Sequence, residues 1–162
     1  MVFRAAVITA SDRSYRGERE DESGPLVAQM LKAAGYQVVS CDILPDERHT
    51  LADRMKAICD KNEADLIVTT GGTGFSPRDC TPEATMDIAE RPVPGIPEAM
   101  RAYGLQKTNR AILSRSAAAI RGKTLIINLP GSPRAAKENL ECVLDALEHG
   151  LQMLTGAPET PE

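Results

Sequence analysis

Segments rich in apolar and β-branched residues alternate along this chain with segments whose apolar residues lie on one helical face. The segments at residues 4–10, 36–44 and 66–70 have the length and composition of strands, and the last is too short for a globular helix. Between them, residues 23–35 and 49–61 place apolar residues at helical spacing. This alternation predicts a mostly parallel, doubly wound α/β sheet with helices on both faces.

The middle of the chain is rich in proline. The hydroxyl of Thr81 followed by Pro82 predicts the N-cap and first turn of a helix that continues to about residue 89. Three prolines within residues 91–97 predict a rigid, extended connector, because no polar low-complexity tract surrounds them as in a domain linker. Residues 98–106 are expected to form the next helix.

The C-terminal third combines a hairpin with a long helix. Residues 117–120 and 124–129 predict two strands joined by a short turn. Residues 134–154 carry apolar residues at helical spacing and predict the last helix. A proline- and acid-rich tail follows at residues 155–162 and is expected to fray. We therefore expect a single domain over residues 1–154 and a flexible C-terminal tail.

Length and composition fit one soluble globular domain, since the 162 residues are 42% hydrophobic and 26% charged. The net charge of −4 and the absence of tryptophan argue against nucleic-acid or anionic-membrane binding. No signal peptide is expected, and no apolar run approaches the roughly 18 residues of a spanning helix. The four cysteines form no C-x-x-C pair and predict neither a zinc site nor a disulfide framework, so we expect a reduced, cytoplasmic protein.

The loop that follows residues 66–70 carries the strongest candidate chemistry. Gly71, Gly72 and Gly74 fall within four positions, with Thr73 among them. A strand, a glycine-rich turn and a helix N-terminus bind phosphates through converging backbone N–H groups and the helix dipole. The lysine of a Walker loop and the G-x-G-x-x-G fingerprint are both absent, so the loop predicts an anion site outside those two classes. A tight turn that binds nothing is the alternative.

Asp79, near the end of this loop, changes the ligand that the loop predicts. A carboxylate beside a phosphate site repels the phosphate unless a cation lies between them. Mg²⁺ bound by one or two carboxylates and by phosphate oxygens resolves that conflict. A surface ion pair with the neighbouring Arg78 is the structural alternative for Asp79.

Four polar loops follow predicted strands. They are residues 11–13, 45–47, 71–79 and 131–133. Ligands of open parallel sheets bind beyond the carboxyl ends of the strands, so we expect these loops to share one edge. Asp46 and Asp79 would then lie within reach of one cation. As alternatives, Asp12 and Asp46 could be ordinary turn residues and Ser132 a helix cap.

Five longer stretches of the chain resemble a known family. They are TTGGTG at residues 69–74, SPRDCTPEAT at 76–85, RPVPGIPEAMR at 91–101, ILSRS at 112–116 and RGKTLIINLPGSPRAAKE at 121–138. Together they resemble the MogA and MoaB proteins of molybdenum cofactor biosynthesis, to which the G domain of gephyrin is related. The resemblance spans nearly the whole chain, and the joint pattern is far more specific than a lone glycine loop.

The resemblance implies a three-layer α/β/α fold of the molybdopterin-binding-domain type, usually assembled as a homotrimer. Active members are molybdopterin adenylyltransferases, nucleotidyltransferases that use Mg²⁺ and ATP to attach AMP to the terminal phosphate of the pterin and release pyrophosphate. The motifs of those members map their two important aspartates onto Asp46 and Asp79, as catalytic residues and Mg²⁺ ligands. For this reaction we expect the polar loops to supply the other contacts to the substrates ATP and molybdopterin, which are Ser11, Asp12, Gly71, Gly72, Thr73, Gly74, Gly131 and Ser132, with Gly131 and Ser132 on the pterin side.

Two other functions stay open at this point. One is a non-catalytic molybdopterin-binding or scaffold module of the MoaB or gephyrin type, and the other is a nucleotide pyrophosphatase. The retained aspartate loops indicate the active MogA type, whereas the chain length is closer to MoaB. Expected partners are molybdopterin, ATP, further copies of the chain and other cofactor-biosynthesis enzymes, with no nucleic acid and no membrane. Molybdenum and tungsten pathways fit the sequence equally well.

Overall fold

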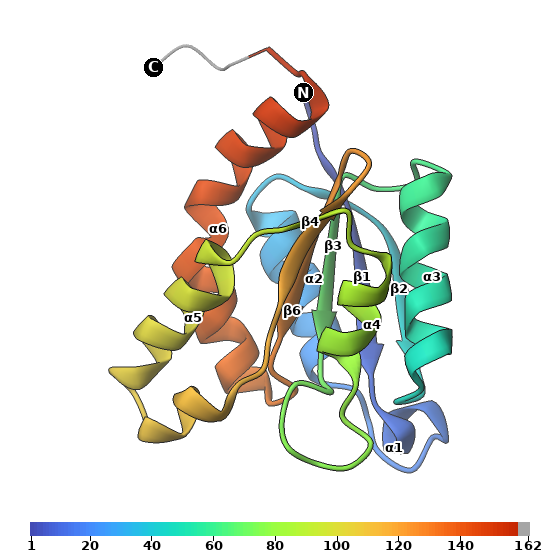
Figure 1. Cartoon of the computed structure of the whole chain (residues 1–162), viewed down its shortest axis with the longest axis vertical. Helices are drawn as coiled ribbons and strands as arrows, with labels where there is room; N and C mark the ends of the chain where they lie inside the picture. The colour runs from blue at the N-terminus through green and yellow to red at the C-terminus, as the bar shows by residue number, and fades with distance from the viewer. Residues whose placement is uncertain (159–162) are drawn as a thin grey trace.

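Six strands form one sheet with helices on both faces in the computed structural model, which describes residues 1–158 (Figure 1). The order across the sheet is β2-β1-β3-β6-β5-β4. The strands are β1 (Arg4–Ala10), β2 (Gln37–Leu44), β3 (Leu66–Thr70), β4 (Arg91–Pro92), β5 (Ala118–Arg121) and β6 (Thr124–Leu129). The first four in this order run parallel, and the β6–β5 and β5–β4 pairs are antiparallel. The prediction of a mostly parallel sheet is confirmed.

The helices divide between the two faces of the sheet. They are α1 (Asp12–Tyr15), α2 (Ser23–Ala33), α3 (Arg48–Asp60), α4 (Thr81–Ile88), α5 (Gly95–Leu105), the 3₁₀ helix η1 (Asn109–Leu113) and α6 (Pro133–Thr155). Buried side chains of α2, α5 and α6 pack on one face, and those of α3 and α4 pack on the other. This is the three-layer α/β/α arrangement that the resemblance implies. No helix within residues 1–158 is both long and apolar enough to cross a bilayer.

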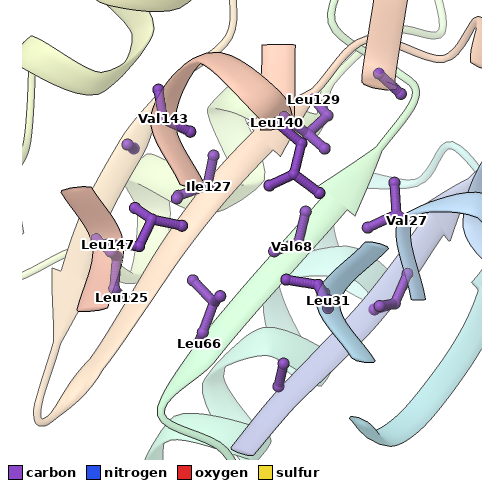
Figure 2. Close-up of a cluster of buried hydrophobic side chains, with 14 of the residues drawn as sticks. Val27, Leu31, Leu66, Val68, Leu125, Ile127, Leu129, Leu140, Val143 and Leu147 are labelled. Carbon is purple, nitrogen blue, oxygen red and sulfur yellow. The ribbon is translucent and has the colours of Figure 1, made fainter. Parts of the chain in front are cut away.

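The central strand β3 is buried on both of its faces. Leu66 and Val68 join the cluster beneath α2 and α6 (Figure 2), whereas Ile67 joins the cluster beneath α3 and α4. Burial of one such side chain contributes about 1.5–3 kcal/mol relative to exposure. Two-sided burial explains why β3 begins with a continuous apolar run instead of alternating apolar and polar residues.

The proline-rich segment differs from the predicted extended connector. Residues 91–92 form the edge strand β4, and the neighbouring N–H groups of Glu90 and Val93 donate hydrogen bonds to carbonyls of β5. Proline is tolerated at such an edge position. Helix α5 begins at Gly95, three residues before its predicted start, because Pro97 lies in the first turn, where its missing N–H removes no helical hydrogen bond. The connector prediction is therefore wrong for residues 95–97.

Two predicted helix ends also change. Thr81 is the first residue of α4 and not its N-cap, which is Cys80. The cause is a tertiary contact, since the Thr81 N–H donates to the carbonyl oxygen of Gly72 at 3.1 Å and so closes the glycine loop onto the helix. The C-terminus of α6 also differs: the helix includes Thr155 and ends at Gly156, which has a left-handed backbone conformation. Ala157 still packs against the core, and residues 159–162 of the predicted tail lie outside the described residues.

The parallel strands bring the ends of β1, β2, β3 and β6 to one edge of the sheet. In the ladders, Ala10 pairs with Leu44, and Thr70 pairs with both Thr9 and Leu129. The loops after these strands therefore begin at the same level, at the bottom of Figure 1, where α1 and the loop after β3 lie. The predicted sharing of one edge by the four polar loops is a consequence of this register.

Candidate active site

A cleft of about 290 Å³ opens at the carboxyl edge of the parallel strands. Seven of the ten candidate site residues line it: Ser11, Asp46, Gly71, Gly72, Asp79, Gly131 and Ser132. Thr73 and Gly74 instead line a neighbouring cleft of about 260 Å³, on the side of α5, η1 and α6. Asp12 lines neither of these two clefts. Residues from all four polar loops thus meet at one site.

The backbone of the glycine loop packs closely against its neighbours. Gly71 has φ +99°, and a Cβ at this position would overlap the carbonyl oxygen of Ala10 at the end of β1. A Cβ at Gly131 would lie 3.2 Å from the Cα of Gly71. The turns after β1, β3 and β6 therefore touch through backbone atoms. Side chains are excluded from the floor of the cleft, where an anion can approach the backbone N–H groups that follow Gly71; the Gly71 N–H itself donates to the Leu129 carbonyl at 3.0 Å.

Asp46 and Asp12 hold each other's loops in place. The Asp12 N–H donates to Oδ2 of Asp46 at 3.0 Å, and the Asp46 N–H donates to Oδ1 of Asp12 at 2.9 Å. Arg78 then binds both carboxylate oxygens of Asp12, at 3.0 and 3.1 Å, and this contact lowers the pKa of Asp12. The surface ion pair of Arg78 with Asp79, which was the structural alternative for Asp79, does not form, because Arg78 pairs with Asp12 instead. Asp12 therefore orients Asp46, and its own carboxylate is already paired with Arg78.

The second carboxylate oxygen of Asp46 is buried beside the glycine loop. This Oδ1 atom and Oγ1 of Thr81 have no hydrogen-bond partner within residues 1–158. Both face Gly72, where an added Cβ would overlap Thr81 Oγ1 and lie 3.1 Å from Asp46 Oδ1. Burial raises the pKa of Asp46, and the charges of Asp12 and Asp79 raise it further. An unpartnered, half-buried carboxylate of this kind is suited to a cation.

Asp79 faces the same cleft from the loop after β3. Its Oδ2 accepts a hydrogen bond from the Ser76 N–H at 3.1 Å, and its own N–H donates to the Ser76 carbonyl at 2.9 Å. Asp79 therefore closes a tight turn and also lines the cleft. Because no hydrogen bond within the described residues uses its Oδ1, that oxygen is open to a ligand.

A metal bound here would need ligands from outside the chain. Within residues 1–158, no group of three His, Cys, Asp or Glu side chains is arranged to hold a metal ion. Asp46 and Asp79 both line the cleft, and Mg²⁺ commonly uses one or two carboxylates together with substrate phosphates and water. The residues present therefore fit Mg²⁺ delivered with a phosphate substrate, and not a closed structural metal site.

Ser132 is a helix cap as well as a cleft residue. Its Oγ accepts a hydrogen bond from the Ala135 N–H at 3.2 Å, and Pro133 occupies the first turn of α6. The sequence predicts either a helix cap or a phosphate contact for this hydroxyl, and the structure shows the cap. The N-terminus of the long helix α6 consequently faces the cleft and favours negative charge there.

The charge of the cleft is mainly acidic. Besides Asp46 and Asp79, its lining includes three consecutive acidic residues, Glu20, Asp21 and Glu22. Arg19 is the one basic residue lining this cleft, and it makes no ion pair within the described residues. An anionic ligand would therefore meet Arg19, backbone N–H groups and any bound cation as its positive partners.

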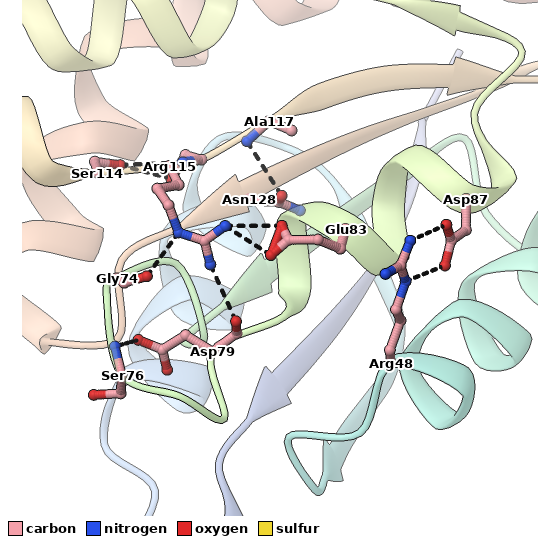
Figure 3. A network of polar contacts seen from close by, with 11 residues as sticks. Arg48, Gly74, Ser76, Asp79, Glu83, Asp87, Ser114, Arg115, Ala117 and Asn128 are labelled. Carbon is pink, nitrogen blue, oxygen red and sulfur yellow. Dashed lines mark hydrogen bonds and ion pairs between the residues drawn. The ribbon is translucent and has the colours of Figure 1, made fainter.

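Three residues of the site were missed by reasoning from the sequence. Arg19 lies in a charged loop, and nothing in the sequence of that loop indicated that Arg19 lines the cleft. Thr81 was interpreted as an N-cap. Arg115 comes from the connector between η1 and β5 and hydrogen-bonds to the loop after β3 (Figure 3). The signal for Arg115 in the sequence is its position in the ILSRS stretch, which is part of the family resemblance.

The chain is similar to several known proteins. A family model described as a probable molybdopterin binding domain matches residues 6–149. A Helicobacter pylori (strain J99) protein named molybdopterin adenylyltransferase is 41% identical over 152 residues, which cover 93% of this chain and 86% of that protein. A Dictyostelium discoideum protein named gephyrin is 40% identical over 164 residues, covering 95% of this chain and 23% of that protein. The solved structure of the molybdopterin biosynthesis enzyme MoaB from Thermus thermophilus aligns with a TM-score of 0.92 at 45% identity, covering 98% and 100% of the two chains.

Proposed function

The chain belongs to the molybdopterin-binding family that includes MogA and MoaB, and from this membership we propose that it is a molybdopterin adenylyltransferase of molybdenum cofactor biosynthesis. Its substrates are molybdopterin and ATP, and its products are adenylylated molybdopterin and pyrophosphate. The observation that carries the assignment of the site is the buried, unpartnered Oδ1 of Asp46, which faces the same glycine loop that Asp79 closes.

The reaction transfers AMP between two phosphates. An oxygen of the terminal pterin phosphate attacks the α-phosphorus of ATP and forms a new phosphorus–oxygen bond. The bond from that phosphorus to the oxygen bridging it to the β-phosphorus breaks, and pyrophosphate leaves with the bonding electrons. Because the substrate supplies the nucleophile, the protein contributes positioning and charge stabilisation.

Asp46 and Asp79 are the residues that would hold Mg²⁺, together with phosphate oxygens and water. When bound, Mg²⁺ would neutralise negative charge on the phosphates and on the leaving pyrophosphate. The unpartnered Oδ1 of Asp46 supports this role, because a buried carboxylate oxygen without a partner costs free energy that a cation contact offsets. The carboxylate of Asp12 orients Asp46 through its N–H and stays paired with Arg78.

The anionic groups of the substrates would meet backbone N–H groups. Gly71 and Gly72 leave the floor of the cleft free of side chains, so a phosphate can approach the loop closely. The N-terminus of α6, at Gly131 and Ser132, offers a second phosphate position, which we assign to the pterin. Arg19, which also lines the cleft, contributes a positive side chain.

The direct test is incubation of the purified chain with molybdopterin, α-³²P-labelled ATP and Mg²⁺. We expect the label to appear on the pterin and pyrophosphate to be released, and we expect neither when Mg²⁺ is removed with EDTA. Pterin binding without a labelled product would instead favour the scaffold function suggested by the similarity to gephyrin. ATP cleavage that proceeds without pterin would favour a nucleotide pyrophosphatase.

A further inference from the structure

Arg115 joins both ends of the exposed part of the glycine loop (Figure 3). Its Nε donates to the carbonyl oxygen of Gly74 at 2.8 Å, and its Nη2 donates to the carbonyl oxygen of Asp79 at 3.1 Å. Its backbone N–H donates to the carbonyl oxygen of Thr73 at 2.9 Å. A single residue thus contacts the loop where it leaves the sheet and where it returns to α4.

Apart from Arg115, one side-chain pair holds the loop between these contacts to the rest of the described chain: Arg78 binds both carboxylate oxygens of Asp12 at 3.0 and 3.1 Å, from an exposed position. Residues 75–78 are exposed, and the Phe75 side chain keeps 70% of its accessible surface. Within the loop, the two hydrogen bonds between Ser76 and Asp79 close only the local turn. Among residues 1–158, Arg115 provides the one side chain that donates hydrogen bonds to backbone carbonyls of residues 73–79. Hydrophobic burial therefore cannot fix the conformation of this segment.

Arg115 is itself held through its guanidinium group and through the backbone on either side of it. Its Nη1 donates to both carboxylate oxygens of Glu83, at 2.7 and 2.8 Å, and Glu83 lies in the first turn of α4. Nη1 of Arg101, from α5, donates to the carbonyl oxygens of Ser114 and Ser116, at 3.4 and 3.2 Å, on either side of Arg115. The planar fork of arginine can satisfy Glu83 and two carbonyls at once, which the single ammonium of lysine cannot do in the same geometry.

We propose that Arg115 is a positioning residue: it fixes the conformation of residues 74–79 and thereby places the Asp79 carboxylate at the cleft. Arg115 does not itself line that cleft, so its effect passes through the loop. The conformational part of this inference stands on the contacts alone. Its kinetic part rests on the proposed adenylylation.

Arg121 is a matched control for Arg115, because it contacts the C-terminal end of α4, whereas Arg115 contacts the first turn of α4. Its Nε and Nη2 bind the two carboxylate oxygens of Asp60 at 2.9 and 3.2 Å, and its Nη1 donates to the carbonyl oxygen of Ile88, the last residue of α4. Arg115 and Arg121 therefore combine the same kinds of contact, a two-oxygen carboxylate and a backbone carbonyl. Only Arg115 reaches the glycine loop.

The conformational test uses the absence of tryptophan from the chain. Phe75→Trp introduces one fluorophore at an exposed loop position, and Arg115→Lys and Arg121→Lys are then compared in that background. We expect Arg115→Lys to lower the fluorescence anisotropy and to raise the acrylamide quenching constant by about twofold or more, because the released loop samples open conformations. Arg121→Lys should leave both signals unchanged.

The kinetic test measures turnover against Mg²⁺ concentration in the same variants without the tryptophan. We expect Arg115→Lys to lower turnover at limiting Mg²⁺ by about 10- to 100-fold, with partial recovery at high Mg²⁺, since misplacement of Asp79 weakens its share of the ion. Arg121→Lys should keep the parent's Mg²⁺ dependence.

The fluorescence and kinetic measurements distinguish a failure of the proposed function from a failure of the positioning role. If the parent forms no adenylylated pterin, the proposed function is wrong, and the fluorescence comparison still decides whether Arg115 orders the loop. If Arg115→Lys and Arg121→Lys behave alike in fluorescence and, with an active parent, in Mg²⁺ dependence, the positioning role is wrong. Circular dichroism spectra that match the parent would exclude unfolding as the cause of any loss.

Discussion

At the scale of the residue, Asp46 combines a functional position with a local cost in stability. One of its carboxylate oxygens accepts a hydrogen bond from Asp12, and the other is buried without a partner within the described residues. This arrangement costs stability, because a buried, unpaired acceptor lowers the free energy of unfolding. In the proposed function, a cation bound at this oxygen would offset that cost.

The pH dependence of stability should report this cost. Burial raises the pKa of Asp46 above its ordinary value of 3.8, so the folded protein binds this proton more tightly than the unfolded chain. The stabilising contribution of that proton is fully present below the unfolded pKa and is lost as the pH rises through the folded pKa. Asp46→Asn keeps an acceptor for the Asp12 N–H and removes the titration. As the pH rises from 3.8 through the raised pKa of Asp46, Tm of the parent should therefore fall relative to Tm of the variant.

Differential scanning calorimetry in EDTA measures this difference. Addition of Mg²⁺ at neutral pH should raise Tm of the parent and leave Tm of Asp46→Asn unchanged, since the ion binds the charged carboxylate. A difference in Tm that stays constant over the whole pH range would show that Asp46 titrates normally and would contradict the role given to burial.

At the scale of the element, the site depends on turns whose backbones touch. Gly71→Ala should destabilise the protein by about 3 kcal/mol or more, because it combines a strained left-handed φ with overlap of the Ala10 carbonyl. Gly122, in the β5–β6 turn, also has a positive φ of +57° but open space around it, so Gly122→Ala should cost only about 1–2 kcal/mol. Urea unfolding of both variants makes the comparison, and equal losses would mean that the contact with Ala10 is unimportant.

The start of α6 supplies a second prediction at this scale. Ser132→Asp retains a good N-cap residue and adds a negative charge, so it should weaken molybdopterin binding by about tenfold, or about 1.4 kcal/mol, through repulsion of the pterin phosphate. ATP binding should change much less. Ser132→Asn is the matched control, because asparagine also caps helices but carries no charge. Titration calorimetry that shows equal losses for both ligands would mean that this helix start is a general structural feature.

Elements were predictable from the sequence where the determining interactions are local. The bounds of β3 and β6 followed from apolar runs flanked by turn residues, and the cap of α6 followed from Ser132 and Pro133. The early start of α5 was missed because proline was interpreted as a sign of extended chain, although the first helical turn tolerates it. The parallel order that brings the polar loops together came from the alternation of strands and helices.

Contacts between distant segments were not predictable in the same way. Arg115 reaches the carbonyls of Gly74 and Asp79 across 41 and 36 positions of sequence, and Arg78 reaches Asp12 across 66. Nothing in the local sequence of these arginines distinguishes a residue that orders a loop from one on a solvated surface. The unpartnered oxygens of Asp46 and Thr81 likewise exist only because tertiary packing buries them.

At the scale of the whole molecule, we expect three copies of the chain to assemble. The family resemblance implies a homotrimer, and an apolar groove of about 380 Å³, lined from α5, α6, the β5–β6 hairpin and Val93 of the proline-rich segment, offers a surface for it. Its lining includes Val93, Ile96, Ile120, Leu125 and Leu147. Symmetric association is the common way to bury such a surface. Sedimentation equilibrium at micromolar concentration should give three times the chain mass of 17.4 kDa, and a single-chain mass would contradict this assembly.

The central claim is that Asp46 and Asp79 serve one Mg²⁺ ion in the transfer of AMP to molybdopterin. Its most direct test is a double-mutant cycle in turnover with Asp46→Asn, Asp79→Asn and the combined variant, each checked for folding and for pterin binding. We predict that each single variant folds, binds pterin nearly as the parent does and loses about 10²-fold or more in turnover. The combined variant should lose far less than the product of the two losses, because both carboxylates act on the same ion. Full activity in either folded single variant, or strictly multiplicative losses, would contradict the shared site.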